Sequence, residues 1–79
     1  MSEVDEKFIK INKLHPFYEG RVIVNNISGR FSAEIAIVHS ETKKIFQYVD
    51  TTYGADEAKE ALDLGIQILS DYLLKKKRN

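Results

Sequence analysis

Residues 55–77 read ADEAKEALDLGIQILSDYLLKKK, and they form the clearest pattern in this chain of 79 residues. On a helix of about 100° per residue, their apolar side chains share one continuous arc, and most charged side chains lie opposite. Acidic residues come early and lysines late, as the helix dipole favours. The stretch predicts one long amphipathic helix with Gly54 as its N-cap. Its apolar face consists of Ala58, Ala61, Leu62, Gly65, Ile66, Ile68, Leu69, Tyr72 and Leu73.

Three stretches before this helix have the composition of β-strands. Residues 17–27 and 44–50 are rich in β-branched and aromatic residues, and residues 29–39 alternate between apolar and polar positions. Turn-forming residues separate the three stretches. We therefore expect an α+β fold of order β-β-β-α, in which a three-stranded antiparallel meander over residues 17–50 packs on the helix. The whole chain, residues 1–79, is predicted to form one domain.

The first fifteen residues fit two patterns. Val4, Phe8 and Ile11 are spaced as on one face of a helix, whereas residues 7–14, KFIKINKL, contain a short alternation typical of a strand. We predict a short N-terminal helix or arm over residues 1–15.

The composition limits the classes of function. The chain has no cysteine, which excludes disulfides, thiolate metal sites and a cysteine nucleophile. Hydrophobic residues make up 43% and charged residues 30%, which is typical of soluble globular proteins. The start of the chain, MSEVDEKF, is acidic and lacks the apolar core of a signal peptide, and no apolar run approaches about 20 residues. We expect a cytoplasmic protein without a membrane partner.

Candidate catalytic and metal-binding residues are few. His15 and His39 are the only histidines, and neither is placed at a spacing typical of metal ligands. Glu34 could act as a general base, but the spacing of residues indicates no partner acid, nucleophile or positioned histidine. No glycine-rich phosphate-binding loop follows a predicted strand. The sequence predicts no metal, no cofactor and no enzymatic activity.

The predicted sheet has more apolar residues than one helix can cover. If the alternating strand directs Phe31, Ala33 and Ile35 to the helix, then Ala36 and Val38 point away from it. The other two strands have apolar residues on both faces, and such strands require cover on both faces. That cover is residues 1–15, another subunit or a nucleic acid. We favour a non-catalytic module that forms a homodimer or binds a protein partner through candidate interface residues Val22 (or Ile23), Val24, Ala36, Val38, Phe46 and Tyr48.

Two segments resemble the AP2/ERF-type DNA-binding domain. Residues 18–35 contain Tyr-x-Gly followed by Gly-Arg-Phe-x-Ala-Glu-Ile, and residues 54–61, GADEAKEA, are similar to the start of that family's helix. Small uncharacterised bacterial proteins have the same β-β-β-α outline. The resemblance implies that the sheet face opposite the helix binds DNA in the major groove through projecting arginines. Ala36 stands where the family has one of these arginines.

An AP2-like nucleic-acid-binding protein is therefore the alternative function. Lysine plus arginine and aspartate plus glutamate number 12 each, whereas dedicated nucleic-acid-binding proteins usually have a basic excess. The residues that would contact nucleic acid are three on the strands and two basic clusters, namely Arg21, Arg30 and Glu34, then Lys43 and Lys44, then Lys75, Lys76, Lys77 and Arg78.

Overall fold

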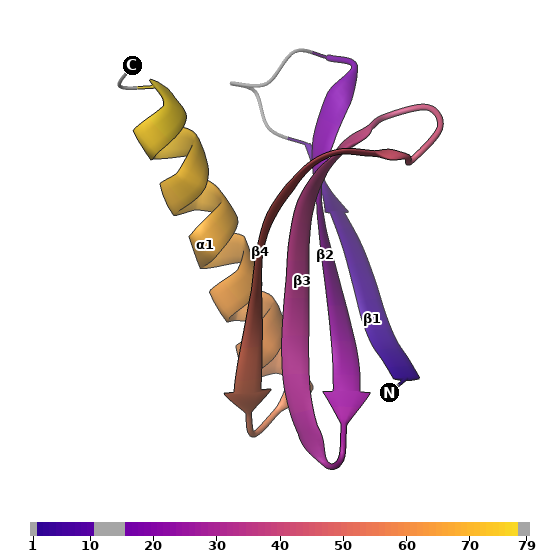
Figure 1. Cartoon of the computed structure of the whole chain (residues 1–79), viewed down its shortest axis with the longest axis vertical. Coiled ribbons are helices and arrows are strands. Elements are labelled where there is room, and N and C mark those ends of the chain that lie inside the picture. The colour runs from indigo at the N-terminus through magenta and orange to yellow at the C-terminus, as the bar shows by residue number, and fades with distance from the viewer. Residues whose placement is uncertain (1, 11–15, 78–79) are drawn as a thin grey trace.

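Four antiparallel strands follow one another in a meander, and one helix completes the chain (Figure 1). The computed structural model describes residues 2–10 and 16–77. The sheet order is β1-β2-β3-β4, and α1 packs on one face of the sheet, against β2, β3 and β4. The fold is therefore α+β, as predicted, but with four strands. The elements are β1 (Ser2–Ile9), β2 (Tyr18–Ile27), β3 (Arg30–His39), β4 (Ile45–Ala55) and α1 (Ala58–Lys77).

The prediction of an N-terminal helix or arm is wrong for residues 2–9, which form strand β1. This strand pairs with β2 in an antiparallel register that places Phe8 opposite Arg21 and Ile9 opposite Gly20. The alternation around Phe8 fits a strand, and pairing with β2 satisfies backbone groups of both strands. A helix of so few residues has little stability of its own. Residues 1 and 11–15 of the predicted arm lie outside the described residues.

A two-residue turn joins β2 to β3. Ser28 and Gly29 both have positive φ angles, 53° and 87°, which is the conformation of a type I′ hairpin turn. The Asn26 side-chain carbonyl accepts a hydrogen bond from the Gly29 amide at 3.0 Å. The hairpin predicted from this turn sequence is therefore present, and it sets the register in which Ile27 lies opposite Arg30.

Strand β4 is longer than predicted, and the helix begins later. The strand continues beyond Asp50 to Ala55, and the register with β3 shifts at three places. Gly54 lies within this strand at a φ of 83° and is not the helix N-cap. The first turn of α1 is instead stabilised by Glu60, whose carboxylate accepts a hydrogen bond from the Asp56 amide at 2.9 Å.

The core lies between α1 and the three strands it covers. The predicted orientation of β3 is confirmed, because Ala33, Ile35 and Ile37 are buried toward the helix. Gly65 allows α1 to lie close to β2, since a Cβ atom at this position would be 2.7 Å from Val22 Cγ1. The buried core residues are Val22, Val24, Ala33, Ile35, Ile37, Ala55, Ala61 and Leu69.

The outer face of α1 is polar and solvent-exposed. Lys59 and Asp63 form an ion pair at 3.0 Å, one helical turn apart. The hydrogen bond from the Lys59 ammonium group to the Asp63 carboxylate, together with the charge of that carboxylate, raises the pKa of Lys59 above the usual value. In the part of the chain that the structure describes, no helix combines the length and the apolar content needed to cross a membrane.

Candidate functional site

The candidate site is the face of the sheet turned away from α1, which we call the open face. Among residues 2–10 and 16–77, no helix or strand covers it. The register and the alternation of side chains along each strand assign its residues. They are Glu3, Glu6 and Phe8 on β1, Glu19, Arg21, Ile23, Asn25 and Ile27 on β2, Arg30, Ser32, Glu34, Ala36 and Val38 on β3, and Ile45, Tyr48, Thr51 and Tyr53 on β4.

Larger neighbours bury the small side chains at the centre of the open face. Ala36 lies between Arg21 and Tyr48 in the register, and its side chain is buried, as is that of Val38. Tyr48 is 52% exposed, and Ile45 on the same strand is 55% exposed. Ala36 and Val38 therefore form the floor of the surface, and the larger side chains around them are available to a partner.

Three residues assigned to this interface from the sequence lie elsewhere. Val22 and Val24 are completely buried in the core under α1. Phe46 is on the helix side of the sheet, where its ring centroid is 4.5 Å from that of Tyr18 and 5.7 Å from that of His39. Strand β2 has apolar residues on both faces, so the sequence pattern could not show which face lies against the core. The register shift in β4 between Ile45 and Gln47 disturbs simple alternation around Phe46.

Phe8, Ile45 and Tyr53 were not among the predicted interface residues. All three are exposed, and the register or alternation places them on the open face. Phe8 lies on the open face because β1 is a strand that pairs with β2. The alternation in KFIKINKL was the signal that could have identified it.

Lys43 connects the loop between β3 and β4 to the open face. Its ammonium group pairs with the carboxylate of Glu19, whose side chain is only 4% exposed, and lies 4.5 Å from the centroid of the Phe8 ring. The loop is closed by a backbone hydrogen bond of 2.9 Å from Lys43 to His39. Lys43 itself has a φ of 62°, a conformation that non-glycine residues rarely adopt. The charge of Lys43 is thus compensated within the protein.

Hydrogen bonds also hold polar side chains in place on the open face. The Asn25 side-chain amide donates to Glu34 Oε2 at 2.9 Å, and Asn25 itself is buried. The hydroxyl groups of Tyr48 and Thr51 share a hydrogen bond. Arg21 is partly buried, and its buried Nε atom has no hydrogen-bond partner among the described residues.

Charges on the open face are sorted along the strands. The cations Arg21 and Lys43 lie in the half nearer the β3–β4 loop, which we call the loop half. The carboxylates of Glu3, Glu6 and Glu34 lie in the half nearer the β2–β3 turn, which we call the turn half. Arg30 also lies at this end, and its charge is paired with that of Asp56. Figure 1 shows this loop and this turn at opposite ends of the sheet. Since the loop-half cation Lys43 is already paired with Glu19, the open face has an excess of negative charge.

The other residues predicted to contact nucleic acid are spread over the molecule. Arg30 forms an ion pair with Asp56 at 3.2 Å, near the start of the helix. Lys75 lines a hollow between β4 and α1 together with Asp50 and Asp71. Lys76 and Lys77 end α1, but their side chains lie outside the described part of the chain, as does Arg78 altogether. The described cations therefore do not form one basic surface with Arg21.

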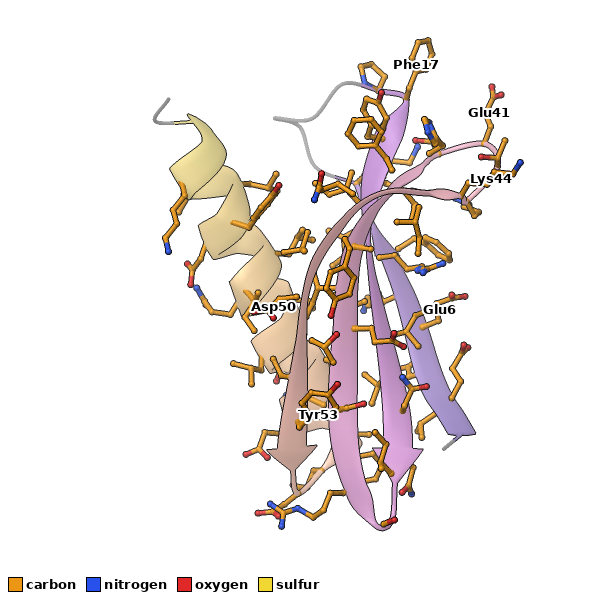
Figure 2. All side chains as sticks on the ribbon, viewed as in Figure 1. Glu6, Phe17, Glu41, Lys44, Asp50 and Tyr53 are labelled. Carbon is orange, nitrogen blue, oxygen red and sulfur yellow. The ribbon has the colours of Figure 1, made fainter. Side chains whose placement is uncertain are left out.

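A cavity of about 470 Å³ opens at the loop end of the sheet. Figure 2 shows Phe17, Glu41 and Lys44, three of its lining residues, at this end of the molecule. Within the described ranges, no group of three or more histidine, aspartate or glutamate side chains could hold a metal ion. The lining residues are Phe17, Tyr18, His39, Glu41, Thr42 and Lys44.

Comparison with known proteins identifies no relative. No protein-family model, curated protein or solved structure matches this chain. The interpretation of the open face therefore depends on its own geometry and charge.

Proposed function

We propose that this protein is a small non-catalytic interaction module that forms a homodimer through the open face of its sheet. The observation that carries the proposal is the group of exposed side chains on that face, Phe8, Ile45 and Tyr48, around a floor of buried small residues. Large apolar and aromatic side chains gathered on one exposed face are typical of protein interfaces.

The size of the open face is sufficient for a weak dimer. Four strands spaced about 4.8 Å apart, each contributing about eight residues of 3.3 Å, give about 500 Å² per copy. Two faces in contact would bury about 1,000 Å², which is near the lower limit for a specific interface. We therefore expect association in the micromolar range, with a measurable monomer population.

The charge of the open face favours a protein partner over nucleic acid. Glu3, Glu6 and Glu34 would repel phosphate groups, and the ammonium group of Lys43 is paired with Glu19. An AP2-like mode of DNA binding requires projecting cations on this face. Among the described residues of the open face, Arg21 is the cation whose charge is not already paired. The nucleic-acid alternative therefore has weaker support.

Sedimentation equilibrium over a range of micromolar concentrations tests the proposal. We expect the mean mass of the wild-type protein to rise with concentration from monomer toward dimer. Tyr48→Ser should raise the dimer dissociation constant about tenfold, as expected for an aromatic interface residue. Leu64→Ser is the matched control, because Leu64 is 44% exposed on α1, away from the open face, and it should leave the dissociation constant unchanged.

Two results would contradict the proposal. One is a wild-type protein that stays monomeric at the highest concentration. The other is an equal effect of Tyr48→Ser and Leu64→Ser on association. A monomer that binds duplex DNA, with an affinity that falls steeply as salt rises, would support the nucleic-acid alternative instead.

A further inference from the structure

We infer that two copies pack open face to open face with their strands antiparallel, so that Arg21 of one copy lies between Glu6 and Glu34 of the other. This inference rests on the proposed self-association and adds its geometry. It starts from the sorting of charge along the sheet, with Arg21 in the loop half and Glu6 and Glu34 in the turn half.

Symmetry leaves two simple arrangements of a face-to-face dimer. The two-fold axis of such a dimer lies in the plane between the sheets, because both copies contribute the same surface. An axis parallel to the strands would place each turn half on the other turn half, and so carboxylates on carboxylates. An axis perpendicular to the strands places the turn half of each copy on the loop half of the other. Charge complementarity selects the perpendicular axis, since like charges across an interface oppose association.

The register then determines which residues meet. Glu6 on β1 and Glu34 on β3 both lie opposite Ile23 of β2, and Arg21 is the next residue of β2 on the same face. A perpendicular axis that passes between Arg21 and Ile23 keeps β2 of one copy over β2 of the other. Arg21 is thereby placed over Ile23 of the second copy, with Glu6 and Glu34 of that copy on either side.

Two features of the single chain fit this contact. The Arg21 side chain is only partly buried and forms no ion pair with any described carboxylate, so a carboxylate from a second copy would supply an acceptor for its guanidinium group. Asn25 donates to Glu34 Oε2, so the carboxylate is held in position before association. Sheets in face-to-face contact are about 10 Å apart, a distance that arginine and glutamate side chains can span together.

Charge reversal tests the inference. Arg21→Glu places carboxylates on carboxylates across the predicted contact, and Glu34→Arg places guanidinium groups near one another. Each variant alone should raise the homodimer dissociation constant at least about tenfold.

Arg21→Gln, which adds no charge, should weaken the dimer less than Arg21→Glu does. Lys59→Glu is the control and should leave the dimer unchanged, because Lys59 lies on the outer face of α1, where it pairs with Asp63. Circular dichroism verifies that each variant is folded.

An equimolar mixture of the two single reversals should recover association to within about threefold of wild type. In the mixed dimer, the carboxylate introduced at position 21 of one copy faces the guanidinium group introduced at position 34 of the other. The second contact of the same dimer is the wild-type pair of Arg21 and Glu34. Both contacts therefore join opposite charges, whereas neither variant has this arrangement with a copy of itself.

The chain that carries both changes provides a second measurement. In Arg21→Glu with Glu34→Arg, positions 21 and 34 again have opposite charges at both contacts. The unchanged Glu6 now lies beside the introduced carboxylate at each contact, whereas the mixed dimer has this repulsion at one contact only. We expect this variant to associate more tightly than Arg21→Glu alone and more weakly than the mixture of the two single reversals.

The outcomes separate the inference from the proposed function. A wild-type protein that is monomeric overturns both. A wild-type dimer that Tyr48→Ser weakens, but that the two single reversals leave unchanged, overturns the antiparallel geometry while the open-face dimer stands. Single reversals that weaken the dimer without recovery in the mixture also overturn the predicted contact between Arg21 and Glu34.

Discussion

Gly65 of α1 lies against Val22 of β2 so closely that a Cβ atom on Gly65 would be 2.7 Å from Val22 Cγ1. The same atom would be 3.3 Å from the Cβ of Ala33. Val22 is completely buried, and its β-branched side chain has little freedom to move aside. The helix can therefore lie at this distance from the sheet only if residue 65 has no side chain.

Gly65→Ala should destabilise the protein by about 1–2 kcal/mol, because overpacking of the core outweighs the gain of about 1 kcal/mol in helix propensity. Urea denaturation measures the change. Val22→Ala removes the atom that the new methyl group would meet, so the double variant should be more stable than the sum of the two single effects predicts. A stabilising effect of Gly65→Ala would contradict the close contact.

Lys43→Met should reduce the free energy of unfolding by about 2 kcal/mol, because it leaves the carboxylate of Glu19 buried without its cation. Thermal or urea denaturation measures this loss. Arg30→Met is the matched control. The side chains of Arg30 and Asp56 are 59% and 79% exposed, so the loss of their pair should change stability by less than about 1 kcal/mol. Similar losses in the two variants would argue against a structural role for the pair of Lys43 and Glu19.

Ser28→Asn should stabilise the protein by about 0.5 kcal/mol, because asparagine adopts the positive φ of a type I′ turn more readily than serine. Gly29→Ala should destabilise it by about 1 kcal/mol, although no atom lies within 4 Å of the added methyl group. The positive φ of Gly29, and not a steric clash, is the reason. Denaturation midpoints of the two variants on opposite sides of wild type would agree with this turn, and a shift in the same direction would not.

Amide hydrogen exchange should divide the sheet into inner and edge strands. Among the described residues, strands β2 and β3 pair on both sides, whereas β1 and β4 each pair on one side only. We expect amides of β1 to exchange at least about tenfold faster than those at the centre of β2 and β3, because an edge strand can open without global unfolding. Equal protection of all four strands would indicate that the edge of β1 is itself covered, for example by another copy.

The elements that the sequence predicted well have a single dominant period. The helix at residues 58–77 and the alternating strand at residues 30–39 each direct apolar side chains to one side, so local pattern and core packing agree. The Ser28-Gly29 turn was also predictable from the sequence, because its positive φ angles require particular residue types. Strand β1 was predicted incorrectly because its few apolar residues fit both a helical and a strand period, and its pairing with β2 decided between them.

The sequence by itself determined the α+β class, the helix and the orientation of β3, because periodicity and turn chemistry are local properties. Only the tertiary structure decided the face on which Val22 lies, the contact of Lys43 with Glu19, and the division of the open face into a cationic and an acidic half. Lys43 and Glu19 are separated by 24 residues and meet through the register of the sheet and a loop residue with positive φ. Strand register and bulges set such contacts, and the pattern of any single strand does not contain them.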